Sequence, residues 1–388
     1  MQSKPEYIDD HASIHKKQSI HAPFDYHPAS SPPPLSSCTT TLAQRRKQRA
    51  SRCLKCCIFL IFLGVAAVSV VLPQVLIGRD SPNPQQGHAL DLTIVPDARL
   101  SQSFYGIDYC VQDDSSLQQV VDDVKVLSQM TTRIRVQIAP NEDDDDPDKT
   151  SLVLEAISLI NTTQQPMGVM LALSDPTSNT QQYEALWKVL NEHGTENVIG
   201  ISVSSSSSSD VSDEQMSTLI QQVQEQMSSH GYPSLPVTPS TTSIQQLVVQ
   251  QQRIANNSHP FFSGIRAEEA TDWMWQHYNH SHMQPRPVQQ IGWPTGPEDQ
   301  PLQDAIPSID NQQMLLDTFV CQANARGVPY YWFEFKDHPP SSSRQKVATF
   351  WGLMDEGRAP KHRHMPTCHV EPWQKTNTTT STATTTTP

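Results

Sequence analysis

One uncharged apolar run limits the architectures open to this chain. Residues 56–77 (CCIFLIFLGVAAVSVVLPQVLI) contain no charged side chain. As a helix with a rise of about 1.5 Å per residue, this run matches a hydrocarbon core roughly 30 Å thick. A secretory signal peptide has a shorter apolar core at the extreme N-terminus, whereas residues 1–55 precede this run and are mostly polar. The run therefore predicts a single transmembrane helix.

The charges on either side of this run predict its orientation. Basic residues crowd its N-terminal side, namely Arg45, Arg46, Lys47, Arg49, Arg52 and Lys55. On the other side Arg79 and Asp80 cancel each other. Because basic residues favour the cytosolic side of a membrane, the N-terminus is expected in the cytosol. The chain is predicted to be a single-pass type II protein of the cell membrane, with its body outside the cytosol.

Composition divides the rest of the chain. Residues 1–55 read as a basic, disordered cytosolic tail, residues 78–100 as a polar stalk, and residues 367–388 as a Thr-rich tail that suits O-glycosylation or plain disorder. The chain as a whole has a net charge of −13 although its head is basic. An acidic body argues against nucleic-acid binding, which needs a basic face on the folded part.

Sequons and cysteines agree with an extracytoplasmic body. Four Asn-x-Ser/Thr sequons follow the apolar run, at Asn161, Asn256, Asn279 and Asn377. Cys53, Cys56 and Cys57 lie at its cytosolic edge, where they suit acylation or burial in the span. The body holds Cys110, Cys321 and Cys368, which allow one disulfide at most within a chain. The sequence leaves the pairing open.

The body alternates short apolar runs with amphipathic stretches. Strands are expected at 103–109, 133–138, 167–173, 197–203, 235–237, 254–258, 288–293 and 328–335. Helices are expected near 117–127, 152–160, 183–190 and 216–227, and in the later gaps between strands. Near-continuous apolar strands separated by helices predict a parallel sheet covered on both faces. Residues 101–366 are therefore predicted to form a (β/α)8 TIM barrel of the α/β class. A doubly wound open sheet is the alternative, but no strand precedes a Gly-rich phosphate loop.

Several segments of this body resemble one known family. They are FYGIDY (104–109), TTRIRV (131–136), the run 183–203, HPFFSG (259–264), GWPTG (292–296), YYWFEF (330–335) and WGLMDEGR (351–358). Together, in this order and at barrel spacing, they are similar to fungal members of glycoside hydrolase family 17, the β-1,3-glucanases of cell walls. The resemblance covers most of residues 103–366 and implies a TIM barrel that acts on cell-wall β-1,3-glucan.

The resemblance also implies two catalytic glutamates, which this chain lacks at the matching positions. Such enzymes use a general acid/base and a nucleophile about 5 Å apart and retain the anomeric configuration. Ser206 stands at the acid/base position and Gln290 at the nucleophile position. A serine hydroxyl cannot protonate a leaving sugar oxygen at neutral pH, and an amide is a poor nucleophile. The carboxylates weighed as substitutes are Asp210, Asp213, Glu214 and Glu334.

The sugar-binding residues are carried over from family motifs at strand ends. They are Tyr109, His259, Phe262, Trp293, Tyr331, Trp332 and Glu334. Aromatic faces stack on pyranose rings, but core packing explains the same aromatics. Gln137 and Asn141 occupy positions where the family has a Tyr and a Cys, which puts one end of this sugar site in doubt.

Two polar segments suggest metal binding but have simpler explanations. The run Glu142 to Asp148 (EDDDDPD) offers oxygen ligands for Ca²⁺ but lacks the glycine turn of a calcium loop, so a solvated cluster is expected. HRHMPTCH (362–369) fits no paired zinc pattern, and a flexible tail is expected there. No cofactor is predicted.

The leading hypothesis is a membrane-anchored surface protein whose barrel has lost hydrolysis and binds β-1,3-glucan. The alternative is an active β-1,3-glucanase or transglycosylase that uses relocated carboxylates. A third possibility is a structural ectodomain without a ligand. The replacements at Ser206 and Gln290 favour the first hypothesis over the second, and the aromatics at strand ends argue against the third.

Overall fold

The computed structural model describes residues 90–112, 114–138, 148–161, 166–174, 180–204, 212–241, 244, 259–280, 286–338 and 349–375. The predicted transmembrane run 56–77, the predicted strand 254–258, Ser206 and the sequons at Asn256 and Asn377 lie outside these ranges. Within them, no helix is long and apolar enough to cross a membrane.

The described strands are all parallel and belong to one curled sheet. They are β1 (Ile107–Asp108), β2 (Arg133–Gln137), β3 (Gly168–Ser174), β4 (Val198–Ser204), β5 (Val237–Pro239), β6 (Gln289–Ile291) and β7 (Tyr330–Trp332). Their order is β5-β4-β3-β2-β1-β7-β6. Beyond the two end strands, Ser240 and Val288 form a parallel bridge. Val288 N–H donates to the Pro239 carbonyl at 2.8 Å, so the sheet closes on itself as a barrel does.

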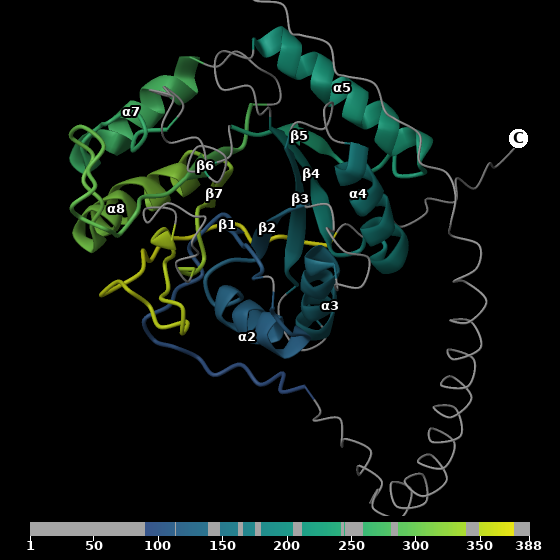
Figure 1. The fold of residues 1–388 in the computed structure, drawn as a ribbon, viewed down its shortest axis with the longest axis horizontal. Coiled ribbons are helices and arrows are strands. Elements are labelled where there is room, and N and C mark those ends of the chain that lie inside the picture. The colour runs from purple at the N-terminus through teal and green to yellow at the C-terminus, as the bar shows by residue number, and fades with distance from the viewer. Residues whose placement is uncertain are drawn as a thin grey trace, which may run out of the picture. The chain divides into compact units, whose positions relative to one another are not determined.

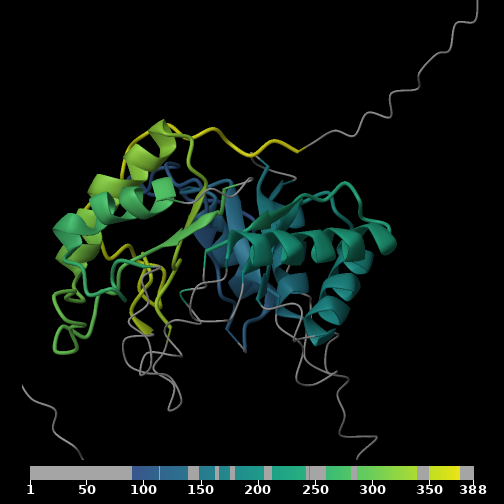
Figure 2. The same ribbon diagram turned by 90° about the horizontal axis from the view of Figure 1, so that it is seen from above.

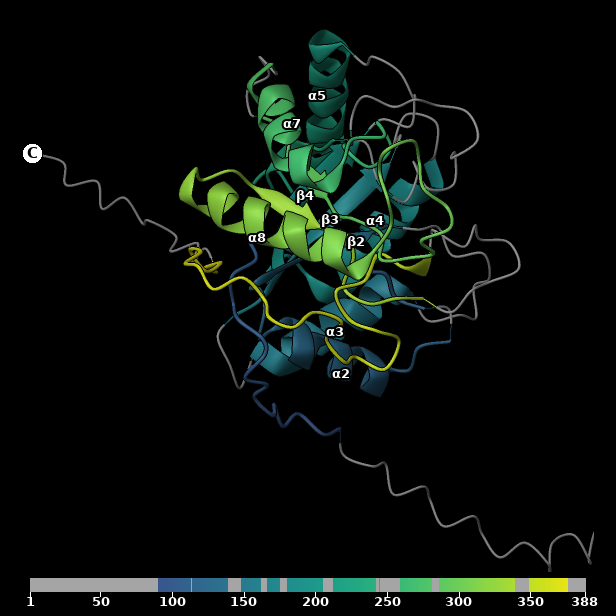
Figure 3. The ribbon, with the colours of Figure 1, turned by 90° about the vertical axis from the view of Figure 1, so that its left-hand side faces the viewer.

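Helices surround this sheet, as Figures 1 and 3 show. They are α2 (Leu117–Leu127), α3 (Lys149–Asn161), α4 (Thr180–His193), α5 (Asp213–Ser229), α7 (Ala267–His280) and α8 (Ile309–Ala325). Ser116 caps α2 and Ser212 caps α5, each with a glutamine three residues on that completes a capping box. Every predicted strand and helix within the described ranges is present, so the prediction of a parallel α/β barrel-like fold is confirmed.

The segment after residue 366 is attached to the barrel. Cys321 on α8 forms a disulfide with Cys368, which settles the pairing that the sequence left open. Trp373 N–H donates to Thr132 Oγ1 at 2.7 Å, just before β2, and its ring would collide with a Cβ added at Gly168, at the start of β3. Residues 367–375 therefore pack along the amino ends of the strands (Figure 2), although the sequence assigned them to a separate tail.

Candidate functional site

A polar pocket lies where the carboxyl ends of the strands meet. Its cavity volume is about 30 Å³, which is enough for a water-sized group and well below the usual size of a small-ligand site. Its lining comprises Asp108, Tyr109, Cys110, Arg135, Gln137, Ala172, Ser202, Ser204, Ser240, Thr241, Gln290 and Phe333. These residues lie on or directly after β1 to β7. This is the end of the barrel at which barrel enzymes carry their active sites.

A buried ion pair forms one wall of the pocket. Arg135 on β2 donates to both carboxylate oxygens of Asp108 on β1, from Nε at 2.6 Å and from a terminal nitrogen at 2.8 Å. The other terminal nitrogen donates to Ser240 Oγ at 2.9 Å. Asp108 and Arg135 lie opposite each other in the parallel register of β1 and β2, which brings their side chains together. The two-point contact fixes both side chains in one geometry.

Gln290 is locked into this wall by its amide group. Its Nε2 donates to Asp108 Oδ2, and its Oε1 accepts from the backbone N–H of Ile244 at 2.5 Å. Its own backbone N–H donates to Thr241 Oγ1 at 2.9 Å. The side chain thus acts as a donor toward a carboxylate and as an acceptor toward the backbone. An amide does both without a change of protonation, whereas a carboxylate can only accept unless it is protonated.

Asp108 is the one carboxylate among the residues that line the described pocket. Burial raises the pKa of Asp108, while Arg135 and the Gln290 amide act in the opposite direction. The end of β4 contributes the hydroxyls of Ser202 and Ser204 instead of an acid. Retaining hydrolysis needs two carboxyl groups facing one glycosidic bond. Among the described residues, the pocket lining supplies one carboxyl group and several hydroxyl groups.

Glu334 lies beside the pocket and pairs with a histidine. Its Oε1 is 2.6 Å from His338 Nε2, and both side chains are buried. The substitutes Asp213 and Glu214 are exposed residues in the first turn of α5 and do not line the pocket. Asp210 lies outside the described residues. Of the three weighed carboxylates that the structure describes, Glu334 alone is near the site.

The predicted aromatic platforms are buried. Tyr109, Trp293, Tyr331 and Trp332 are each at most 1% exposed. Trp332 packs edge-on against Phe104, and Trp293 against Phe261. A ring covered on its faces cannot stack on a sugar. The core-packing alternative therefore describes these four side chains, and only Tyr109 among them contributes to the pocket lining.

His259 and Phe262 also belong to the core. His259 is 1% exposed, and burial lowers its pKa to about 3. It lies in an aromatic cluster with Phe262 and Trp351, at ring-centroid distances of 5.4 Å and 5.9 Å. Its Nδ1 accepts from the Phe261 N–H at 3.3 Å. This neutral, enclosed imidazole is not among the residues that line the described pocket.

Two segments expected to be solvated are partly ordered by buried contacts. Asp148 is 6% exposed, and its Oδ1 accepts from the Thr150 N–H at 2.9 Å at the start of α3; the rest of the acidic run lies outside the described residues. His362 is 4% exposed, so a flexible tail is wrong for the segment that begins there. In both segments the polar side chain is buried and hydrogen-bonded, as buried polar groups usually are, and this contact orders the chain around it.

The sequon at Asn161 has its amide engaged. Its Nδ2 donates to the Met167 carbonyl at 2.9 Å and to Asn197 Oδ1 at 2.9 Å. An attached sugar would replace one of these two hydrogens. Asn279 lies on α7, and glycosylation at all four sequons stays a prediction.

A buried glutamine fixes the tautomer of His362. Gln312 on α8 donates through Nε2 to the carbonyls of Trp293 and Trp351. Its Oε1 must therefore face His362 Nε2, 2.5 Å away, which acts as the donor. Burial first, and then Lys361 and His364, lower the pKa of His362 to about 4.

This depressed pKa predicts acid sensitivity. Between pH 6.5 and about 4 the unfolded chain binds a proton at His362 that the folded chain does not, so stability is complete above pH 6.5 and falls as the pH decreases. This group alone should lower the free energy of unfolding by about 2 kcal/mol from pH 6.5 to pH 5. The free energy of unfolding, measured with urea at several pH values, should depend less steeply on pH in His362→Gln. The glutamine keeps an N–H donor but does not titrate. An identical slope in both proteins would contradict the assignment.

Gln290 was predicted from the sequence, but the ion pair beside it was not. Asp108 lies inside the motif FYGIDY and Arg135 inside TTRIRV. The signal was available, because a charged residue within an apolar parallel strand is costly unless it is paired. Asp108 at the end of β1 and Arg135 in the middle of β2 are such residues on neighbouring strands.

Comparison with known proteins identifies relatives of this domain. A family model described as the BtgE/BtgC glycoside hydrolase domain matches residues 106–352. The probable glucan endo-1,3-beta-glucosidase btgC of Aspergillus flavus is 25% identical over 317 residues, covering 71% of this chain and 45% of that protein. The putative btgC enzyme of Aspergillus niger is 27% identical over 300 residues, covering 67% and 43%. The chain thus spans less than half the length of these curated relatives.

Solved structures agree on the fold. A glycoside hydrolase family 17 β-1,3-glucanosyltransferase from Rhizomucor miehei has a TM-score of 0.51 and 22% identity, covering 70% of this chain and 99% of that one. An active-site mutant of the Rhizomucor enzyme, in complex with laminaritriose, has a TM-score of 0.50 and 22% identity over the same shares. At this identity the likeness concerns the barrel fold alone. The resemblance seen in the sequence is confirmed at the level of the domain.

Proposed function

The chain belongs to the BtgE/BtgC glycoside hydrolase domain family, and we propose that it binds β-1,3-glucan at a cell surface without hydrolysing it. One observation carries the proposal: Gln290 stands in the pocket where a nucleophile is expected, held by Asp108 and by the Ile244 backbone. An amide fixed in this way offers hydrogen bonds but no attacking charge. The only carboxylate in the described pocket lining is paired with Arg135.

The ligand class is inferred from the relatives and from the polarity of the pocket. Curated relatives are named as glucan endo-1,3-beta-glucosidases, and one solved relative was crystallised with laminaritriose. Ser202, Ser204, Ser240 and Gln137 offer hydroxyl and amide groups, which suit sugar hydroxyls. We infer a β-1,3-linked glucan as the ligand.

The location in the cell is part of the same proposal. The uncharged run 56–77 and the basic residues before it support a type II membrane anchor with the barrel facing the cell wall. A glucan-binding domain in that position would link the membrane to the wall polysaccharide.

A binding assay tests the ligand. The full chain, purified in detergent, is incubated with insoluble β-1,3-glucan, and the bound fraction gives the Kd. Replacing Gln137 by Ala should weaken binding about 5- to 10-fold, since a pocket hydrogen bond contributes about 1 kcal/mol.

The matched control is Gln221→Ala, an exposed glutamine on α5 outside the pocket, which should bind like the unmodified chain. Equal Kd values for the two variants, or no binding by the unmodified chain, would refute a glucan site in this pocket. Trp293→Ala is a poorer probe, because removing a fully buried indole destabilises the barrel itself.

A further inference from the structure

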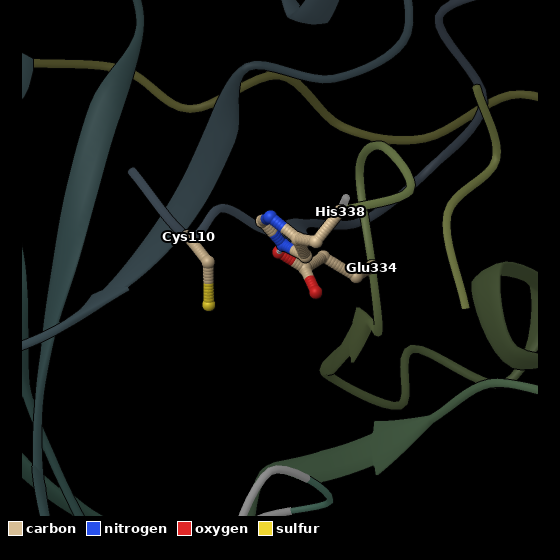
Figure 4. Close-up of side chains that lie close together, drawn as sticks. All are labelled: Cys110, Glu334 and His338. Carbon is tan, nitrogen blue, oxygen red and sulfur yellow. Dashed lines mark hydrogen bonds and ion pairs between the residues drawn. The ribbon is translucent and has the colours of Figure 1, made fainter. Parts of the chain in front are cut away.

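Three side chains with different metal-binding atoms converge beside the pocket. They are Cys110, which follows β1, and Glu334 and His338, which follow β7 (Figure 4). A thiol sulfur, a carboxylate oxygen and an imidazole nitrogen all lie within 4.8 Å of one another. Cys110 is part of the pocket lining, but the glucan-binding proposal is argued from other residues, and the inference below does not depend on that proposal.

The barrel itself brings these groups together. β1 and β7 are neighbours in the sheet, with Ile107 opposite Trp332, so residues just beyond both strands reach the same rim. Phe335 N–H donates to the Asp108 carbonyl at 3.1 Å and continues this pairing past the strand ends. The Glu334 backbone exchanges hydrogen bonds with Trp351 and Leu353 at 3.1 Å and 2.9 Å. The cluster is therefore built on paired backbone.

The cluster is buried except on the side of Cys110. Glu334 is 3% exposed and His338 is 6% exposed, with 2.6 Å between Oε1 and Nε2. Cys110 is partly exposed and lines the pocket. The space between the three donor atoms is therefore reached from the pocket, on the side of Cys110.

We propose that Cys110, Glu334 and His338 bind Zn²⁺, with the fourth coordination position open to the pocket. Zn²⁺ accepts sulfur, nitrogen and oxygen ligands in tetrahedral geometry, and sites with three protein ligands keep one position for water or another ligand. A thiolate disfavours Ca²⁺ and Mg²⁺, which prefer oxygen. Tetrahedral ligation requires the Glu334 oxygen and the His338 nitrogen to separate from 2.6 Å to about 3.3 Å, a small side-chain adjustment.

The charges balance on binding. The S–H bond of Cys110 breaks, its proton goes to solvent, and a bond from sulfur to zinc forms. Ligation through Nε2 requires a neutral His338 ring with its proton on Nδ1, so the proton between Nε2 and Glu334 moves to Nδ1, or to solvent if Nδ1 already carries one, and nitrogen and oxygen each donate an electron pair. One thiolate and one carboxylate then neutralise a divalent ion, and a neutral centre is tolerated in a buried position. No oxidant or reductant is needed.

Cobalt spectroscopy tests the site, because four-coordinate Co²⁺ substitutes for Zn²⁺ and absorbs visibly. The full chain is prepared with Cys38, Cys53, Cys56 and Cys57 changed to Ser, which leaves Cys110 as the thiol outside the Cys321–Cys368 disulfide. Titration should reach saturation at one equivalent, with a thiolate-to-cobalt charge-transfer band that Zn²⁺ abolishes.

Variants assign the ligands. In Cys110→Ser the charge-transfer band should disappear, and in Glu334→Gln and His338→Ala the affinity for Zn²⁺ should fall by more than about 100-fold. The control His364→Ala/His369→Ala changes two exposed histidines near Cys368 and should leave the titration unchanged. No band in the Cys110-containing protein, or an equal band in Cys110→Ser, would overturn the proposal. Circular dichroism of each variant separates loss of a ligand from loss of the fold.

Discussion

Replacing Asp123 by Ala is expected to lower the free energy of unfolding by about 3 to 5 kcal/mol, because it leaves the buried Lys336 ammonium without its partner. Asp123 on α2 is 1% exposed. It accepts from Lys336 Nζ at 2.6 Å, from Arg358 Nε at 2.5 Å and from the Tyr109 hydroxyl at 2.7 Å. One carboxylate thus joins α2 to the segments after β7 and to a residue of the pocket wall.

Urea unfolding followed by tryptophan fluorescence measures this effect. Asp122→Ala is the matched control, since the neighbouring carboxylate is 38% exposed and pairs with Lys125 and Gln118, and Lys125 keeps Asp91 as a second partner. Its loss should cost less than about 1 kcal/mol. If Asp123→Ala were as mild as Asp122→Ala, the buried network would not hold the barrel together as described.

Restoring a carboxylate at the nucleophile position is expected to destabilise the chain. In Gln290→Glu a second acid would replace the amide nitrogen that donates to Asp108 Oδ2. Two adjacent buried carboxylates cannot both ionise, so one must take a proton. Protonating a glutamate of ordinary pKa at pH 7 costs about 3.7 kcal/mol. We therefore expect Gln290→Glu to lose up to about 4 kcal/mol at pH 7.

The pH dependence separates this mechanism from a general packing defect. At pH 5 the same protonation costs only about 1 kcal/mol, so most of the lost stability should return. Gln290→Met loses both amide hydrogen bonds but should show a penalty that does not change between these pH values. In Asp108→Asn/Gln290→Glu the second acid is gone, and the pH-dependent part should disappear. A Gln290→Glu penalty that is equal at pH 5 and pH 7 would contradict the contact between Gln290 and Asp108.

The alternation of apolar strands and amphipathic helices was sufficient to predict the barrel. The run 167–173 is apolar throughout, and 197–203 is apolar except for Asn197 and Ser202, as is typical of strands covered on both sides. They correspond to β3 and β4. Periodicity could not show that residues 367–375 pack against the strand ends, because a disulfide and a few backbone contacts hold that segment. Such contacts leave no repeating pattern.

The site was only partly predictable. A polar residue before Gly-Trp-Pro identified Gln290, but no pattern distinguishes a buried aromatic from one that faces a groove. Trp293 and Trp332 therefore looked like sugar platforms, whereas the barrel encloses both. The grouping of Cys110 with Glu334 and His338 depends on β1 and β7 being neighbours. Cys110 is more than two hundred positions away from Glu334 and His338 in the sequence, and the pairing of β1 with β7 brings it to them.

The absence of hydrolysis is the central claim, and one measurement tests it most directly. The full chain is incubated with laminarihexaose, and the sugars are separated by mass at intervals, with parallel samples bound to insoluble β-1,3-glucan. We expect that the hexasaccharide alone is recovered while the protein is retained on the polysaccharide. Shorter sugars would demonstrate hydrolysis, and longer ones would demonstrate glucanosyl transfer. Either product would show that other carboxylates, with Asp108 and Glu334 the first to replace, carry out the chemistry that Gln290 cannot.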